Sequence, residues 1–230
     1  MTQQDLSAVS PALARYEKDV LLGEVWRRPG MSTRDRSIVT LATFIARGQA
    51  SPLPASIERA LDDGVTAREI SEIVTHLAFY AGWGAAVTAM PPIAAAFAKR
   101  GIETADLPPA SPVPLPLDPA AEARRASAVE QSVGPVSRQL ADDTGAVLFR
   151  DLWLRPDLAP RDRSLVTVAA LVAGGQFAQV TFHLGKAMDN GLTVEEASAM
   201  LSHLAYYAGW PGAMSAVPVF KGVFESREAS

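Results

Sequence analysis

Residues 34–49 read RDRSIVTLATFIARGQ, and residues 161–176 read RDRSLVTVAALVAGGQ. The two stretches lie 127 positions apart, and the same shift aligns the chain on both sides of them without a gap. Between 33–97 and 160–224, 27 of the 65 aligned positions are identical. The chain is therefore a tandem duplication of one unit, and this observation fixes its domain organisation before any element is assigned.

A proline-rich segment separates the two copies. Residues 104–119, TADLPPASPVPLPLDP, contain six prolines, which disfavour both helix and sheet ladder and favour an extended strap over the surface. We therefore predict a first repeat at 1–103, a linker at 104–119 and a second repeat at 120–230. The second repeat begins with AAEARRASAVEQSV, which predicts an extra N-terminal helix.

Apolar residues in each copy recur at the spacing of a helix. In the stretch from Arg34, the residues Ile38, Leu41, Ala42 and Ile45 follow one another at intervals of three and four. The many β-branched residues make a buried strand the competing interpretation. The periodic run exceeds ten residues, which favours a helix.

Helix boundaries are marked in the same way in both copies. Gly64 is suited to the left-handed position that ends a helix, and Thr66 with Glu69 forms the pattern of a capping box at the start of the next. The stretch DNGLTVEE at 189–196 repeats these signals. No alternating segment of useful length occurs, so the predicted class is all-α.

Composition limits the function. The 230 residues are 48% hydrophobic and 20% charged, a globular balance, and the net charge of −4 with scattered basic residues argues against nucleic-acid binding. We expect no membrane span and no secretory signal, and hence a cytoplasmic protein. The absence of cysteine excludes disulfides, thiolate nucleophiles and cysteine-bound zinc or iron–sulfur clusters.

Two of the three histidines belong to a duplicated motif, HLAFYAGW at 76–83 and HLAYYAGW at 203–210. His76 and Tyr80, like His203 and Tyr207, are four residues apart and share one helix face. One interpretation is a polar pair that lines a pocket, with histidine as general acid or base. The other is a buried histidine bonded to a neighbour, with tyrosine filling the core.

The third histidine, His183, is not duplicated, because Ser56 stands at the matching position. If a site needs a histidine here, only the second copy supplies it, and that copy is catalytic. The alternative is a surface histidine lost by drift in the first copy. Three histidines could also hold zinc, although the sequence has no HxH or HExxH spacing.

Arginine and tryptophan are further candidates for a pocket. The RDRS motif places Arg161 and Arg163 near a helix start, where they either cap the helix and pair at the surface or clamp a substrate carboxylate. Trp83 and Trp210 follow glycines at helix ends, where they are either core residues or pocket walls.

The run RDRSLVTVAAL at 161–171, followed by HLGKAMDNGLTVEEASAMLSHLAYYAGWPGAMSA at 183–216, resembles the carboxymuconolactone decarboxylase family. The resemblance covers residues 10–100 and 136–226. It implies the all-α fold shared with alkylhydroperoxidase D-like proteins, and homo-oligomers built as rings. For a fused pair of units, it implies a trimer equivalent to a hexamer of single units.

The peroxidase branch of this superfamily uses Cys-x-x-Cys-x-x-x-His and a preceding Glu. The resemblance places these positions on Gln176, Gln179, His183 and Ser164. In the first copy they fall on Gln49, Pro52, Ser56 and Ser37. Without the cysteines, thiol peroxidase chemistry is excluded. The remaining branch implies a lyase of aromatic degradation that acts, without a cofactor, on a carboxylated γ-lactone of the β-ketoadipate pathway.

Loss of CO₂ needs a bound carboxylate, a stabilised oxyanion and a proton donor. We hypothesise that His203 transfers the proton, with His183 as its partner in one shared pocket, and that no metal takes part. The alternatives are a non-catalytic binding subunit and a histidine-bound metal enzyme. The residues predicted to bind the small-molecule substrate are Gln176, Tyr207, Arg163, Arg161, Trp210, His76 and Tyr80.

Overall fold

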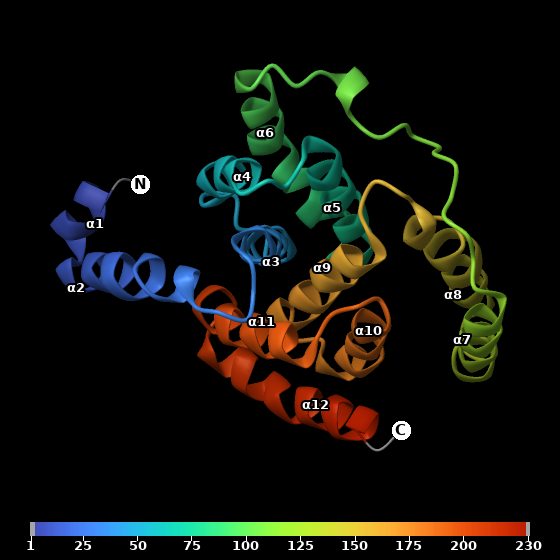
Figure 1. Cartoon of the computed structure of the whole chain (residues 1–230). Coiled ribbons are helices and arrows are strands. Elements are labelled where there is room, and N and C mark those ends of the chain that lie inside the picture. The colour runs from blue at the N-terminus through green and yellow to red at the C-terminus, as the bar shows by residue number, and fades with distance from the viewer. Residues whose placement is uncertain (1–2, 229–230) are drawn as a thin grey trace.

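The computed structural model describes residues 3–228, and within this range the regular elements are all helical, which confirms the all-α prediction (Figure 1). None of these helices is both long and apolar enough to span a membrane. The first repeat contains α1 (Gln3–Val9), α2 (Pro11–Arg15), α3 (Thr33–Ala46), α4 (Leu53–Asp62), α5 (Ala67–Tyr80) and α6 (Trp83–Lys99). The second contains α7 (Pro119–Ser132), α8 (Arg138–Asp143), α9 (Pro160–Ala173), α10 (Phe177–Asp189), α11 (Val194–Tyr207) and α12 (Trp210–Glu228).

Helices α3 and α9 form the centre of the molecule. They come from the two RDRS stretches, pack against each other, and are buried along almost their whole length. A helix that is covered on all sides lacks a one-sided apolar stripe, so its sequence pattern leaves a buried strand as the competing interpretation. The helix assignment is correct.

The two repeats exchange contacts through this central pair. Helix α5 packs against α9 of the other repeat, and α11 packs against α3. The helices that carry the duplicated His-Tyr motif therefore face residues of the opposite repeat. This crossed packing decides which side chains meet in the candidate sites.

The predicted helix boundaries are confirmed in both repeats. Gly64 and Gly191 have φ values of 90° and 103°, in the left-handed region that favours glycine. Thr66 and Glu69 form a complete capping box at the start of α5, and Thr193 and Glu196 form its equivalent at the start of α11. These caps set where each histidine-bearing helix begins.

The linker crosses the surface as an extended strap, residues 107–118, after a short 3₁₀ turn at Thr104–Asp106 (η3, Figure 1). Arg68 donates to the carbonyls of residues 106 and 107, and Arg155 donates to those of residues 109 and 110. The strap is thus attached to both repeats. Residue 119, predicted as the linker's last, is the first residue of α7.

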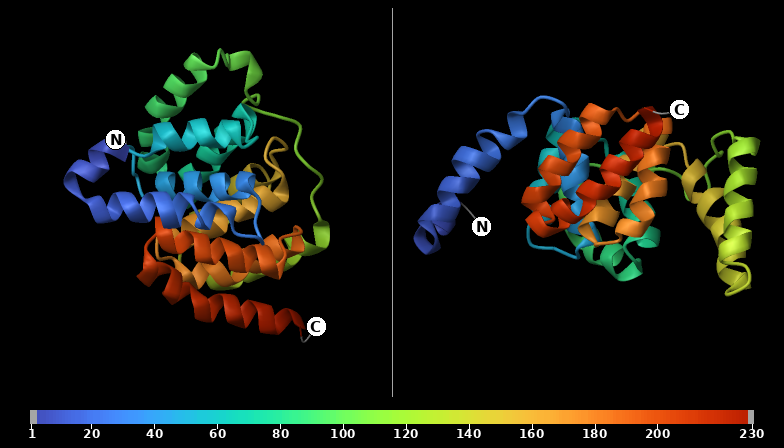
Figure 2. Two further views of the ribbon diagram at one scale, coloured as in Figure 1. Left: turned by 60° about the vertical axis from the view of Figure 1, so that its left-hand side comes forward. Right: turned by 90° about the horizontal axis from the view of Figure 1, so that it is seen from below.

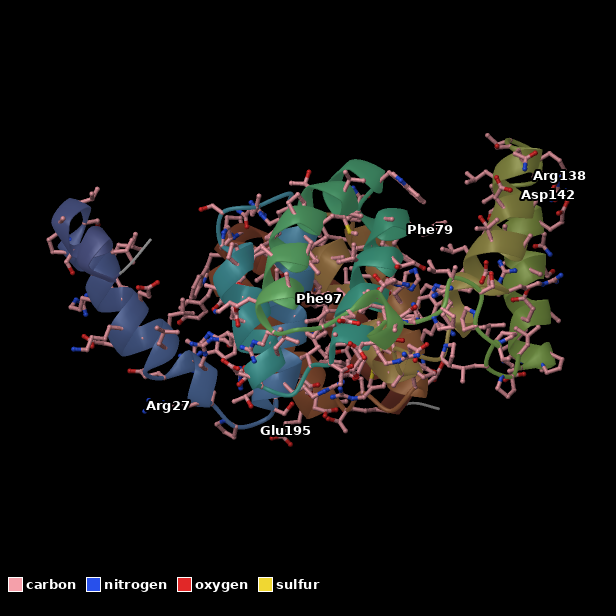
Figure 3. All side chains as sticks on the ribbon, turned by 90° about the horizontal axis from the view of Figure 1, so that it is seen from above. Arg27, Phe79, Phe97, Arg138, Asp142 and Glu195 are labelled. Atoms are coloured by element: carbon pink, nitrogen blue, oxygen red, sulfur yellow. The ribbon has the colours of Figure 1, made fainter. Side chains whose placement is uncertain are left out.

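Two arms stand on opposite sides of this body (Figure 2). One consists of α1, α2 and the π-helical turns Tyr16–Leu22 (η1), and the other of α7, α8 and the similar turns Thr144–Phe149 (η4). Figure 3 shows Arg138 and Asp142 of the second arm set apart from the body. Each repeat therefore begins with an arm helix, and α7 is longer than α1.

Candidate functional site

The duplicated histidines lie in two similar clusters, each built from both repeats. The first cluster combines Trp26 and Thr40 of the first repeat with His203 and Tyr207 of the second. The second cluster combines the equivalent residues with the repeats exchanged. Its members are Trp153, Thr167, His76 and Tyr80, joined by His183.

In the first cluster, Nε2 of His203 lies 2.8 Å from Oγ1 of Thr40. The indole Nε1 of Trp26 donates to the phenol oxygen of Tyr207 at 2.8 Å. The Trp26 ring also meets His203 edge-on, with centroids 5.3 Å apart. Trp26 is provided by the short 3₁₀ helix Val25–Arg27 (η2), which holds it over the start of α3. Nδ1 of His203 has no hydrogen-bond partner.

The hydrogen bonds of the second cluster indicate which ring nitrogen of His76 carries the hydrogen. The Thr167 hydroxyl donates to the carbonyl of Arg163 at 2.8 Å, so its lone pairs face Nε2 of His76, 2.7 Å away. His76 therefore donates from Nε2. The Nδ1 lone pair then faces a guanidinium nitrogen of Arg163 at 3.4 Å. Trp153 donates to Tyr80 at 2.8 Å, as Trp26 does to Tyr207.

All three histidines are held neutral. Burial, and to a lesser extent the charge of Arg36, lowers the pKa of His203 to about 3. Burial and the nearby Lys186 lower the pKa of His183 to about 4, and burial with Arg163 holds the pKa of His76 well below its usual value. At neutral pH these rings are neutral hydrogen-bonding groups that can accept a proton at one nitrogen while releasing one from the other.

A cleft of about 860 Å³ opens beside the first cluster, and its lining includes Trp26, Thr40 and Tyr207. Burial raises the pKa of Tyr207, so its phenol stays protonated and can donate a hydrogen bond. The further polar residues of the cleft include one carboxylate and are Tyr16, Glu17, Ser37, Gln49, Ser51, Ser56, Arg59 and Tyr206. Gln49 Oε1 is buried without a hydrogen-bond partner.

The corresponding space in the second cluster is filled. Phe182 and His183 stand where the first repeat has Ala55 and Ser56. The His183 ring stacks on Trp153, with centroids 5.8 Å apart, and meets Tyr80 edge-on at 5.1 Å. A neighbouring cleft of about 590 Å³ reaches Trp153 and Phe182, but its lining includes neither Thr167 nor Tyr80.

The structure separates the two histidines that were expected to share one pocket. His183 lies on α10 and contacts the second cluster, whereas His203 points from α11 into the first. Gln176 is exposed at the start of α10, and Trp210 is exposed beside Tyr206, outside the contacts of the first cluster.

The two arginines expected to bind a carboxylate are engaged by carboxylates of the protein. Arg163 is fully buried and pairs with Glu72 at 2.9 Å. Arg161 pairs with Asp35 across the repeat boundary at 2.8 Å and with Glu196 at 2.7 Å. In residues 3–228, no group of three histidine, aspartate or glutamate side chains is arranged to hold a metal ion.

Two equivalent pairs of cluster residues were not predicted from the sequence to belong to a site. Trp26 and Trp153 match under the 127-residue shift, and so do Thr40 and Thr167. The duplication was thus a usable signal. However, an apolar helix gives no indication that one of its threonines will meet a histidine of the other repeat.

The model of the carboxymuconolactone decarboxylase family matches residues 11–95 and 138–222. The chain is similar to 4-carboxymuconolactone decarboxylase of Acinetobacter baylyi, with 38% identity over 80 residues, 35% of this chain and 60% of that protein. It is also similar to nitrosuccinic acid decarboxylase npaB of Metarhizium robertsii, with 38% identity over 68 residues, 30% of this chain and 48% of that protein. The matches thus span only about half of each relative. Because the family model covers most of the chain in two successive copies, the chain belongs to the carboxymuconolactone decarboxylase family.

Proposed function

We propose that the protein is a cofactor-independent decarboxylase of a small carboxylic acid, with its active site in the cleft beside the first cluster. The observation that carries the proposal is that this cleft reaches Thr40 and Tyr207, which contact a buried, neutral His203. The names of both relatives, each a decarboxylase, support the reaction class.

The substrate class that we propose is a carboxylated γ-lactone or another acid with an electron acceptor beside the carboxylate. The bond between the carboxylate and the neighbouring carbon breaks, and CO₂ leaves. The electron pair delocalises onto an oxygen of the acceptor, and a proton then adds to carbon. The protein must bind a carboxylate, donate hydrogen bonds to the developing oxyanion and supply one proton.

The cleft offers a group for each task. Arg59 lies over the Trp26 ring at 4.3 Å and supplies a guanidinium for a carboxylate. The Tyr207 phenol donates to the oxyanion. Thr40 passes a proton from Nε2 of His203 to the substrate carbon, while a second proton enters the ring at the unpartnered Nδ1. After the product leaves, water in the cleft returns a proton through Thr40 to Nε2 as Nδ1 releases its own, which restores the starting tautomer. His203 thereby remains neutral at the end of each turnover.

The cleft also contains the positions that the family resemblance marks in the first repeat. Ser37, Gln49, Pro52 and Ser56 all line it. In the second repeat, His183 at the matching position is buried between aromatic rings. We therefore assign catalysis to the first cluster and a structural role to the second, including His76, Tyr80 and Arg163.

The matched tyrosines provide the test. CO₂ release would be measured with carboxylated γ-lactones and with nitrosuccinate. We expect Tyr207→Phe to lower kcat/KM by about 10²–10³-fold, because it removes an oxyanion donor, and Tyr80→Phe to leave it nearly unchanged. Equal losses in the two variants would contradict the assignment. Tight binding of these acids without CO₂ release would instead indicate a non-catalytic binding subunit.

We also propose that the chain assembles as a trimer through its arms. Both arms expose equivalent apolar residues. Val9 and Val136 are each 87% exposed, and Leu13 and Leu140 are exposed beside them. Such side chains on a projecting arm are suited to packing against another copy. Light scattering after size-exclusion chromatography should give three times the chain mass of 24.4 kDa, and a monomer would contradict the proposal.

A further inference from the structure

Arg36 and Arg163 occupy equivalent positions in the two repeats but have different partners. In the second cluster, Arg163 donates to Oε2 of Glu72 at 2.9 Å, and Arg155 donates to Oε1 of the same carboxylate at 2.7 Å. Arg163 and Glu72 are both almost fully buried. The Glu72 carboxylate thus neutralises the buried guanidinium of Arg163 and links it to the guanidinium of Arg155.

The equivalent carboxylate is missing beside Arg36. Ala199 stands where the second cluster has Glu72, and Arg28 stands where it has Arg155. Arg36 is 1% exposed, and its Nη2 donates to the carbonyls of Arg28 and Pro29 at 2.6 and 3.4 Å. Its Nε has no partner, as is also true of Arg163, but unlike Arg163 it forms no ion pair with any residue between 3 and 228. A buried charge without a counter-ion is unfavourable.

The space left by the missing side chain is open. A cavity of about 680 Å³ is lined by Arg36, Arg28 and His203, together with Ser198 and Ser202. Gly30, another lining residue, stands at the position of Asp157, so a second acidic side chain is absent here. The Arg28 side chain is 41% exposed, whereas that of Arg155 is 12% exposed beneath the strap.

One acidic residue, Glu195, borders this cavity. It is exposed, forms no ion pair with Arg28 or Arg36, and lies at the edge of the molecule in Figure 3. The nearest carboxylate to Arg28 is Glu24, at 4.0 Å in an exposed pair. The buried carboxylate of Asp35 acts on Arg36 only from a distance and is itself paired with Arg161 and Arg34. Neither guanidinium group at the cavity therefore has a buried carboxylate in contact with it.

We propose that Arg36 and Arg28 form a binding site for a small carboxylate, which takes the place that the Glu72 carboxylate occupies in the other half. A guanidinium presents its N–H groups in a planar fork that suits a carboxylate, and the second repeat holds a carboxylate in this way. His203 also lines the cavity and has an unpartnered Nδ1. The site does not depend on the proposed decarboxylase activity, so binding can be measured without a known substrate.

Acetate is the simplest probe. The melting temperature would be measured in sodium acetate and in sodium chloride of equal ionic strength. We expect acetate to raise it by about 3–6 °C at ten times the dissociation constant, because the ligand binds only the folded chain. In the NMR spectrum of the wild-type protein, acetate should shift the Arg36 Nε–H resonance. No acetate-specific rise and no shift would overturn the proposal.

The duplication supplies the matched variants. Ala199→Glu installs the carboxylate found in the other half, so it should raise the melting temperature in chloride and abolish the acetate response. Ala95→Glu adds the same charge on the exposed face of α6 and should leave the response intact. Glu72→Ala should lower the melting temperature and add an acetate response at Arg163. An unchanged response in Ala199→Glu would place acetate elsewhere and overturn the proposal.

Discussion

The Thr40 hydroxyl lies 2.8 Å from Nε2 of His203, although 163 residues separate the two in the chain. His76 and Thr167 form the equivalent contact at 2.7 Å. Both histidines are fully buried, and each depends on the opposite repeat for its hydrogen bond. A buried polar group without a partner is costly, so these contacts link the fold of each repeat to that of the other.

Replacing either threonine by valine should destabilise the protein. Thr40→Val and Thr167→Val each remove a hydrogen-bond partner of a buried imidazole, and we expect each to lower the free energy of unfolding by about 1–3 kcal/mol. Urea denaturation measures this effect. Only Thr40 lines the large cleft, so Thr40→Val alone should also reduce kcat/KM at a temperature where both variants are folded.

Filling the large cleft should abolish activity without unfolding the protein. The double variant Ala55→Phe, Ser56→His copies the side chains that fill the second cluster, and we expect it to lower kcat/KM by at least about 100-fold, because substrate cannot be positioned. The reciprocal variant Phe182→Ala, His183→Ser should keep its activity and lose stability. Activity that survives in the first variant and disappears in the second would place catalysis in the other cluster.

Stability should fall as the pH is lowered through the range of free histidine. In the unfolded chain a histidine has a pKa of about 6.5. Folding lowers it to about 3 for His203 and about 4 for His183. Below pH 6.5 the unfolded state therefore binds more protons, and each such histidine removes about 1.4 kcal/mol of stability per pH unit. The loss continues until the pH reaches the folded pKa.

The non-duplicated histidine allows this slope to be checked. His183→Ser introduces the residue that the first repeat has at this position, and it should reduce the pH dependence of the unfolding free energy by about one proton. Urea denaturation between about pH 6.5 and pH 5 measures the slope in a window where carboxylates contribute little. A slope that is the same in the variant and the wild type would show that His183 is not held neutral by the fold.

The free energy of unfolding should depend strongly on the carboxylate of Glu72. Glu72→Gln leaves the buried Arg163 without its counter-ion, and we expect the free energy of unfolding to fall by about 3–5 kcal/mol. Glu130→Gln is the control, because Glu130 pairs with Arg138 on the exposed second arm and should contribute little. Comparable losses in both variants would show that burial does not set the strength of these pairs.

Local features of the fold were predictable from the sequence because they depend on neighbouring residues. The capping box of Thr66 and Glu69 and the left-handed Gly64 follow from backbone geometry over a few positions. The composition of the clusters was not predictable in this way. Periodicity shows that His203 faces inward but not that it meets Thr40, because nothing in a helical pattern specifies the crossed packing of α11 on α3.

The strap of residues 107–118 has a consequence for how the two halves can diverge. Two copies of a single-repeat chain would share one coding sequence, so every substitution would appear on both sides of their contact. Once a linker joins them, Ala55 and Ser56 can leave one side open while Phe182 and His183 occupy the other. Selection can then act on one face for chemistry and on its former twin for rigidity, an independence that identical subunits do not have.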